Sequence, residues 1–395
     1  MASLAISIVT ETFTPDINGV ATTWAHMVDG LCARGHDIEL VRPIPEGVHP
    51  IKTKANEVFV PGVPLPFYST LRFGLPAKKM LLKHWGHHRP DVVHIVTEGP
   101  LGWTAMAAAT ALGLPISTSF HTNFHRYSRY YGYGWLGRPL ITYLRYFHNK
   151  ASLTFVPTQT MAKELASYGF QRLAILGRGV NTTLFSPEKR DTELRRQWGV
   201  HHDDLAIAYV GRLAVEKNVP LALNSFNAIQ KRFPRAKMVV VGDGPARNKL
   251  LALYPDFIYC GPQHGEALAR HYASCDLFLF PSLSETYGIV ILEAMASGLG
   301  VVAFDYGAGK QHILDQHNGF LVSLGDEPQF MATAVASASD PKKLKTLAQA
   351  ARKSALQHTW DHIVNQFEER LTILAKTGAN VHVTKPRYPH TAPFP

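Results

Sequence analysis

The sequence predicts an α/β protein with two parallel-sheet domains. Its 395 residues suit two domains of ordinary size. Short apolar runs alternate with helical stretches in two successive series, and continuous hydrophobicity is typical of strands that are buried on both faces. Hydrophobic residues make up 46% of the chain and charged residues 18%, which is enough apolar material for two cores and excludes a disordered chain.

The expected strands fall into two groups. The first group comprises residues 3–9, 37–41, 92–96, 116–120 and 153–156, and the second comprises 205–210, 237–241, 257–260, 277–280 and 301–304. Between 177 and 204 glycines, a proline and dense charge replace any strand-like run, so the boundary between the domains is expected there. After residue 341 the pattern is helical to about 376, with an interruption at 357–359.

The number of cysteines and the N-terminal residues indicate the cellular compartment of the protein. Three scattered cysteines, Cys32, Cys260 and Cys275, do not suit a disulfide framework or a thiolate metal site. The apolar run near the N-terminus is too short for a secretory signal or a membrane span. We therefore expect a cytoplasmic protein in a reducing compartment.

The positive charge is concentrated in one part of the chain. Residues 58–163 hold eleven Lys or Arg and two acidic residues, a net charge of +9 out of +10 for the whole chain. Within it, residues 126–150 combine five bases with eight large aromatic side chains, which favours the surface of an anionic bilayer. The candidate membrane residues are Arg126, Arg129, Trp135, Arg138 and Arg145.

Two other interpretations of the segment 126–150 exist. A helix that packs its tyrosines on the domain core would have the same composition. Single-stranded nucleic acid also uses aromatic and basic side chains, but no RNA-binding motif accompanies them, and we expect no nucleic-acid partner.

The most informative segment begins at Pro281. A strand ends there and is followed by Glu285, by Tyr287 and Gly288, and by a helix that carries Glu293 and stops at Gly298. Free amides at a helix N-terminus bind phosphate, which makes those of Tyr287, Gly288, Ile289 and Val290 a candidate diphosphate seat. One carboxylate precedes the seat and one follows it, as the sugar and the ribose of a nucleotide sugar would require. Two ordinary surface glutamates are the alternative.

A second segment supports this interpretation. The strand at 205–210 runs into Arg212, and Lys217 follows five residues later. Cations just beyond the carboxyl end of a parallel strand face the crevice where α/β sheets bind ligands, and they can converge on a phosphate there. Structural Arg and Lys residues are also common at strand ends.

These motifs resemble a known family. G-R-L-A-V-E-K-N at 211–218, V-V-V-G-D-G-P at 239–245 and the segment 284–298 look like retaining glycosyltransferases of family 4, which have the GT-B fold. E-T-F-T-P-x-x-x-G-V at 11–20, T-E-G-P-L-G at 97–102, S-F-H-T-N-F at 119–124 and G-R-G-V-N-T-T-L-F at 177–185 are similar to its sulfoquinovosyl- and mannosyltransferase branch, which acts on lipids. The resemblance spans about residues 6–374.

The resemblance implies two Rossmann-like domains with a cleft between them. The expected organisation is an acceptor domain at 1–176, a linker at 177–199 and a nucleotide-sugar domain at 200–357. A helix at 358–376 returns to the first domain, and the proline-rich tail at 377–395 is expected to be disordered.

It also implies roles for individual residues. Glu285 is expected to contact hydroxyls of the donor sugar and Glu293 the ribose, whereas Arg212 and Lys217 hold the diphosphate. Gly19 is expected near the phosphate and the acceptor, and His121 at the reacting sugar. In one departure, Asn181 replaces the acidic residue usual at that position, which leaves the turn chemistry intact.

We expect neither a metal nor a cofactor. No Asp-x-Asp occurs, so cations and a helix dipole are expected to neutralise the leaving diphosphate. The first strand is not followed by the G-x-G-x-x-G of a dinucleotide site, which argues against a dehydrogenase.

The predicted function is transfer of a hexosyl group, with retention, from GDP-mannose or a UDP-sugar to a membrane lipid such as diacylglycerol or glycosyl-diacylglycerol. The enzyme is expected to bind the inner face of the cytoplasmic membrane peripherally. A soluble or polysaccharide acceptor is one alternative. A nucleotide-sugar 2-epimerase and a non-catalytic nucleotide-sugar sensor are alternatives of other classes.

Overall fold

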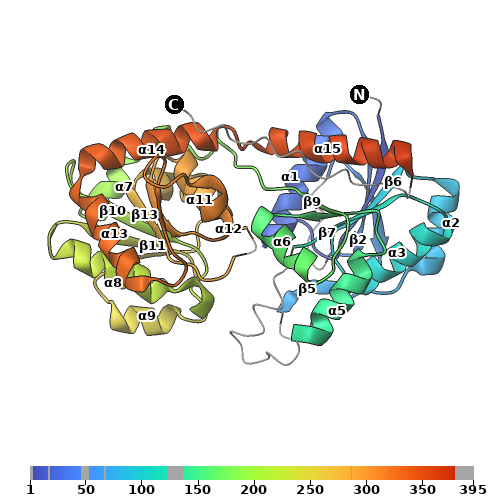
Figure 1. The fold of residues 1–395 in the computed structure, drawn as a ribbon, viewed down its shortest axis with the longest axis horizontal. Helices are drawn as coiled ribbons and strands as arrows, with labels where there is room; N and C mark the ends of the chain where they lie inside the picture. The colour runs from blue at the N-terminus through green and yellow to red at the C-terminus, as the bar shows by residue number, and fades with distance from the viewer. Residues whose placement is uncertain are drawn as a thin grey trace.

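The computed structural model describes residues 3–16, 18–45, 53–65, 68–121, 137–285 and 287–378. They form two lobes side by side, each with a sheet between layers of helices (Figure 1). We call the part around the first sheet the N-terminal lobe and the part around the second sheet the C-terminal lobe.

The sheet of the N-terminal lobe has seven parallel strands in the order β3-β2-β1-β6-β7-β8-β9. The strands are β1 (Ala5–Val9), β2 (Asp37–Pro43), β3 (Asn56–Val60), β6 (Val92–Ile95), β7 (Ile116–Ser119), β8 (Leu153–Val156) and β9 (Leu173–Ile175). An antiparallel hairpin joins β4 (Gly62–Leu65) to β5 (Tyr68–Gly74). The helices are α1 (Gly19–Ala33), α2 (Lys78–His87), α3 (Pro100–Ala111), α5 (Gly137–His148) and α6 (Gln159–Ser167).

The sheet of the C-terminal lobe has six parallel strands in the order β12-β11-β10-β13-β14-β15. The strands are β10 (Ala206–Val210), β11 (Lys237–Val241), β12 (Ile258–Gly261), β13 (Leu277–Phe280), β14 (Gly300–Phe304) and β15 (Phe320–Val322). The helices are α7 (Thr192–Gln197), α8 (Val219–Gln230), α9 (Arg247–Leu253), α10 (Gly265–Ala273), α11 (Ile289–Ala296), α12 (Gly307–His312), α13 (Glu327–Ser339) and α14 (Pro341–Ala355).

The predicted fold class is confirmed, and each of the ten expected strands is present within two residues of its predicted ends. Five further strands, β3, β4, β5, β9 and β15, were not predicted. β9 and β15 have three residues each, too few for a clear apolar run, and β3 is an edge strand whose residues are mostly half-exposed. Sheet edges need less apolar sequence than sheet centres, and they leave a weaker signal.

Two stretches of chain cross between the lobes next to each other. The amide of Val180 donates to the carbonyl of His358 at 2.8 Å, and Val180 forms a β-bridge with Thr359. The second crossing continues into α15 (Trp360–Thr377), which lies along α1 on the N-terminal lobe (Figure 1). Part of the expected linker belongs to the C-terminal lobe, because Phe185 and Trp198 are buried in the same core as β10.

Each sheet has one point where the strand order reverses. In the N-terminal lobe it lies between β1 and β6, and in the C-terminal lobe between β10 and β13. Loops that leave neighbouring strands at such a point diverge to opposite faces of the sheet and open a crevice. The motifs at 11–20 and 211–218 begin in the loops after β1 and β10. The motif at 284–298 begins in the loop after β13 and continues through α11.

Candidate active site

A cleft of about 440 Å³ lies where the two lobes meet. It contains nine of the predicted site residues: Gly19, His121, Arg212, Lys217, Glu285, Tyr287, Gly288, Ile289 and Val290. Asn18, Val20, Arg178, Gly211 and Phe280 also line it. The cleft therefore brings together residues that are up to 272 positions apart in the sequence, from Asn18 to Val290.

On the C-terminal side, two glycines let the loops after β10 and β11 pack closely. A Cβ on Gly242 would lie 2.0 Å from the carbonyl oxygen of Gly211, and one on Gly244 would lie 2.5 Å from that of Leu213. The amide of Leu213 donates to the carbonyl of Asp243 at 2.9 Å. The segment 239–245 thus supports the loop that carries Arg212.

Lys217 and Glu285 form an ion pair in the cleft. The Lys217 Nζ atom lies 2.5 Å from the Glu285 carboxylate, and both side chains are largely buried. Arg212 is different, because its side chain is 50% exposed and the nearest carboxylate oxygen, on Glu216, is 3.9 Å away. Arg212 is therefore free to reorient toward an anion, whereas Lys217 neutralises Glu285.

The helix α11 begins at the floor of the cleft. Its N-cap is Gly288, at φ +88°, a left-handed conformation that a side chain would strain. Gly288 offers no side-chain cap, so the first amides of the eight-residue helix remain available to a ligand. The helix ends as predicted, with Gly298 at φ +76° directly after it.

Glu293 lies on α11 but outside the group that lines the cleft. Its carboxylate accepts a hydrogen bond of 3.1 Å from the hydroxyl of Tyr272, on α10. Burial raises the pKa of Glu293 to about 7, and the Tyr272 hydrogen bond opposes this shift. This carboxyl group therefore changes charge near neutral pH.

On the N-terminal side, α1 points its first turn at the cleft. The side chain of Asn18 caps this helix by accepting from the amides of Val20 and Ala21 at 3.0 and 2.9 Å. The predicted residue Gly19 follows it and lines the cleft.

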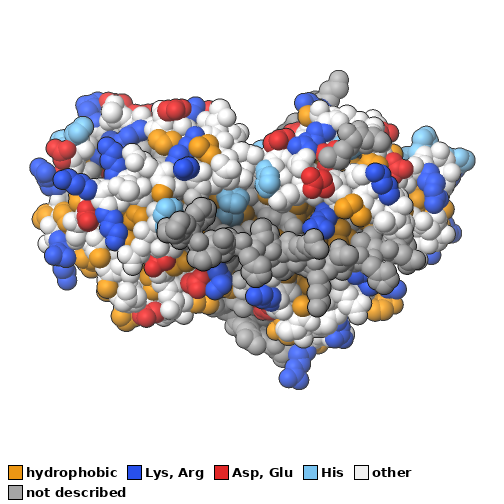
Figure 2. All heavy atoms as spheres, turned by 45° about the horizontal axis from the view of Figure 1, so that its top comes forward, with side chains coloured by type: hydrophobic (Ala, Val, Ile, Leu, Met, Phe, Trp, Pro, Cys, Tyr) orange, Lys and Arg blue, Asp and Glu red, His pale blue; other side chains and the backbone are white. Residues whose placement is uncertain are grey.

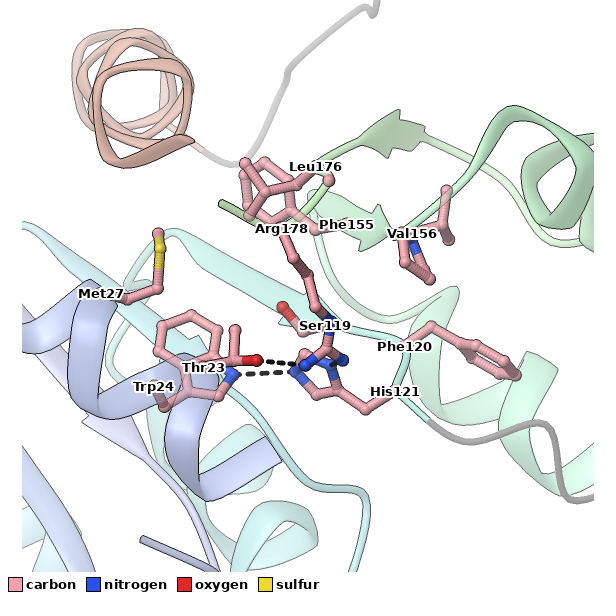
Figure 3. A pocket seen from close by; sticks show the side chains of 12 residues that line it. Thr23, Trp24, Met27, Ser119, Phe120, His121, Phe155, Val156, Leu176 and Arg178 are labelled. Carbon is pink, nitrogen blue, oxygen red and sulfur yellow. Dashed lines mark hydrogen bonds between the residues drawn. The ribbon is translucent and has the colours of Figure 1, made fainter. Parts of the chain in front are cut away.

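His121 follows β7 and is held in a neutral state. Its Nε2 atom accepts a hydrogen bond of 2.8 Å from the indole of Trp24, and its Nδ1 atom faces the guanidinium of Arg178 at 3.4 Å (Figure 3). Burial, followed by the charge of Arg178, lowers the pKa of His121 well below its ordinary value. His121 is thus a neutral residue at the cleft and is not poised to donate a proton.

Comparison with known proteins gives the same picture for the whole chain. The family model "Glycosyltransferase Family 4" matches residues 17–184, and the model "Glycosyl transferases group 1" matches residues 204–340. A GDP-mannose-dependent alpha-mannosyltransferase of Mycolicibacterium smegmatis is 32% identical over 92% of this chain and 97% of its own length. The chain belongs to glycosyltransferase family 4.

Further comparisons agree with this assignment. An alpha-monoglucosyldiacylglycerol synthase of Streptococcus pneumoniae is 27% identical to this glycosyltransferase over 76% of this chain and 71% of its own length. Among solved structures, the Anabaena protein HepE in complex with UDP superposes with a TM-score of 0.75, at 18% identity over 94% of this chain and 100% of the other. That likeness confirms the GT-B fold.

The glycosyltransferase has three residues at this site whose roles the sequence did not indicate. Arg178 and Trp24 hold His121 from opposite sides, and Tyr272 holds Glu293. Arg178 stands within the recognised motif at 177–185, which is the only sequence signal for any of them. The departure at Asn181 behaves as expected, because its side chain accepts from the amides of Thr183 and Leu184.

A pair of carboxyl groups also went unpredicted. Glu11 follows β1 and accepts a hydrogen bond of 2.9 Å from the amide of Leu101, at the start of α3. Burial raises the pKa of Glu11 to about 7, and burial together with the nearby Glu11 raises that of Glu98 to about 7. Glu11 thus serves as the N-terminal cap of a helix whose own cap residue, Gly99, has no side chain.

The predicted membrane residues are described only in part. Arg126, Arg129 and Trp135 lie outside the described residues. Arg138 and Arg145 are both exposed on α5, and the guanidinium of Arg145 donates to the carbonyl of Tyr168 at 3.2 Å. The helix α5 also buries Leu144 and Phe147, so core packing accounts for one of its faces.

The described residues bear on metal binding and on membrane insertion. There, no group of three or more His, Cys, Asp or Glu side chains is placed to hold a metal ion. No described helix is both long and apolar enough to cross a bilayer.

Proposed function

We propose that this glycosyltransferase moves a hexosyl group, with retention, from a nucleotide-diphosphate sugar to a membrane lipid. The observation that carries the proposal is the convergence of Arg212, Lys217 and the open N-terminus of α11 on one cleft. Two cations and a helix dipole aimed at one point suit a diphosphate. The name of the mycobacterial relative favours GDP-mannose as the donor, and a UDP-sugar is the alternative.

The two carboxylates, Glu285 and Glu293, would bind opposite ends of the donor. Glu285 lies in the cleft beside Lys217 and would accept hydrogen bonds from hydroxyls of the sugar. Glu293 lies on α11, about one helical turn beyond its first residue, and would accept from the ribose. The Lys217 cation also prevents repulsion between the Glu285 carboxylate and the incoming diphosphate.

The cations and amides of the site would assist the step in which the glycosidic bond breaks and the diphosphate leaves. As the glycosidic bond ionises, negative charge grows on the leaving phosphate, and Arg212, Lys217 and the amides near Gly288 stabilise it. With this much fixed positive charge, the proposal needs neither a metal nor a cofactor. We propose same-face attack, in which the leaving phosphate takes the acceptor proton, because a double displacement needs two carboxylates flanking the anomeric carbon.

The lipid acceptor rests on two observations. A relative that covers three quarters of the chain is named for diacylglycerol chemistry, and the excess charge lies within residues 58–163 of the N-terminal lobe. In the face shown in Figure 2, Lys and Arg side chains are scattered over both lobes and do not form a single patch. We propose α5 as the docking surface, because this helix belongs to the basic and aromatic segment 126–150 and because Arg138 and Tyr146 are exposed on it.

A donor panel tests the reaction. The enzyme is incubated with GDP-mannose and several UDP-sugars, with and without diacylglycerol vesicles, and nucleotide release and lipid products are measured. Lipid-dependent nucleotide release with a glycolipid product supports the proposal. Isomerised donor would indicate an epimerase, binding without turnover a sensor, and a glycosylated soluble sugar the alternative acceptor.

Sedimentation with vesicles tests the membrane half. We expect binding to anionic vesicles but not zwitterionic ones, and release as salt rises, since exposed charges are screened over about 8–10 Å at physiological ionic strength. Replacing Arg126, Arg129, Arg138 and Arg145 with Gln should reduce binding while sparing donor affinity. The matched control replaces four exposed lysines of the C-terminal lobe with Gln: Lys249, Lys342, Lys345 and Lys353. Equal losses in both variants would contradict a specific surface on the N-terminal lobe.

A further inference from the structure

Arg178 is a buried cation at the wall of the cleft. Its residue surface is only 7% exposed, yet it lines the cleft together with Arg212 and Lys217. Its guanidinium donates to the carbonyl of Gly19 at 2.7 Å and to the hydroxyl of Thr23, and it faces His121 (Figure 3). All of these partners are uncharged at neutral pH.

No carboxylate among the described residues forms an ion pair with Arg178. Burial disfavours the charged form of the guanidinium and lowers the pKa of Arg178 to about 10. A buried charge without a counterion is strongly unfavourable, and proteins ordinarily pair it. Arg195 shows the ordinary case here: it is 4% exposed and lies 3.2 Å from the Asp276 carboxylate.

Arg178 also connects the two sides of the cleft. Its side chain holds the carbonyl of Gly19, at the start of α1 in the N-terminal lobe. Its own carbonyl accepts a hydrogen bond of 3.1 Å from the hydroxyl of Tyr287, which precedes the N-cap of α11 in the C-terminal lobe. The Tyr287 hydroxyl is held in turn by His312 Nε2 at 2.7 Å. One residue therefore links two turns that line the cleft from opposite sides.

We propose that Arg178 is a positioning residue of the donor site: it holds the Gly19 and Tyr287 turns together, and the diphosphate of the bound donor balances its buried charge. This inference rests on the proposed function, because it assigns the missing counterion to the donor. Arg212 and Lys217 act on the diphosphate from the C-terminal lobe, and Arg178 acts from the opposite wall.

The test measures stability and nucleotide binding in the same variants. Thermal unfolding is followed with and without GDP or UDP for the wild type, Arg178→Gln and Arg195→Gln, and nucleotide Kd is measured by calorimetry. Removing an uncompensated charge should leave the Tm of ligand-free Arg178→Gln within about 2 °C of the wild type. Its Kd for the nucleoside diphosphate should rise about 10- to 100-fold, because the diphosphate loses the charge that balances it and the Gly19 turn loses the side chain that holds it.

The control should behave in the opposite way. Arg195→Gln leaves Asp276 without this partner, so it should lower the Tm by several degrees while leaving the Kd unchanged. Arg178→Met is a second neutral variant, so the comparison does not depend on one variant folding. Arg178→Lys keeps the charge but not the planar fork, and it should bind nucleotide within about threefold of the wild type and turn over more slowly.

The possible failures are distinguishable. If neither nucleotide stabilises the wild type, the proposed donor site itself is wrong. If both nucleotides stabilise the wild type and the neutral Arg178 variants equally, or if those variants lose stability but keep their Kd, the inference about Arg178 is overturned and the donor site stands.

Discussion

The cleft has two walls, one formed by residues of the C-terminal lobe and one by residues of the N-terminal side, and the two walls differ in the exposure and pairing of their charged groups. The C-terminal wall presents charged groups that are paired or partly exposed, such as the Lys217–Glu285 pair and the half-exposed Arg212. The N-terminal wall buries its titratable groups, and burial lowers the pKa of His121 well below its ordinary value. Behind it, burial lowers the pKa of His94, in β6, to about 3. The difference shows that the C-terminal wall pairs or partly exposes its charged groups, whereas the opposite wall buries the uncharged His121 beside one buried cation, Arg178.

The largest expected effect comes from removing the cations of the C-terminal wall. The double variant Arg212→Ala and Lys217→Ala loses two charge-assisted contacts of about 1.5–3 kcal/mol each, so transfer should fall by about 10²–10⁴-fold. Lys217→Ala also leaves the buried Glu285 carboxylate without this cation, so the Tm should fall by several degrees while the protein stays folded. Inhibition by free nucleoside diphosphate should weaken in parallel, and wild-type inhibition in this variant would contradict the assignment.

The two carboxylates should separate binding from turnover. Glu293→Ala should mainly raise the donor Kd, because the ribose contact is equal in the ground state and the transition state. Glu285→Ala should mainly lower kcat, because the contact that we propose for it is to the reacting sugar, and the change also removes the carboxylate that pairs with Lys217. Steady-state kinetics combined with nucleotide calorimetry measure both effects. Equal changes in donor affinity alone would rule out this division.

Glu293, on α11 of the C-terminal lobe, also makes the stability of the protein depend on pH. Its pKa is raised by burial from 4.5 to about 7, so the folded state holds a proton that the unfolded chain releases. The resulting stability is complete below pH 4.5 and is lost as the pH rises through 7. The unfolding free energy of the wild type, relative to that of Glu293→Gln, should therefore fall by about 1–3 kcal/mol from pH 5 to pH 8. A constant difference in urea titrations would refute this.

The smallest expected effect concerns Tyr272. Tyr272→Phe removes the hydrogen bond that opposes the upward shift of the Glu293 pKa, so that pKa should rise further. Donor affinity should fall about threefold to tenfold at neutral pH, the cost of about one hydrogen bond, and should recover at pH 8.5 where Glu293 is ionised again. A loss of affinity that does not depend on pH would mean that Tyr272 acts only through packing.

The two walls also differ in how well the sequence predicts them. Arg212, Lys217 and Glu285 directly follow buried strands, so a local pattern places them at the carboxyl edge of a sheet. Arg178 reaches Thr23 across 155 residues, and Trp24 reaches His121 across 97. Such contacts depend on how α1, β7 and the crossing segment pack together, and no local spacing encodes that. His121 was placed at the cleft, but its neutral state follows from neighbours that only the fold reveals.

The path of the chain has a consequence for biosynthesis. The N-terminal lobe is completed by α15, whose Val364, Phe367 and Leu371 are buried in the core beneath α1. The whole C-terminal lobe is translated between β9 and that helix. On the ribosome, the sheet that is made first must therefore wait, with part of its apolar face uncovered, until the second lobe has been synthesised. A nascent chain of this enzyme is expected to need protection by chaperones for its first half, and not for the half that emerges later.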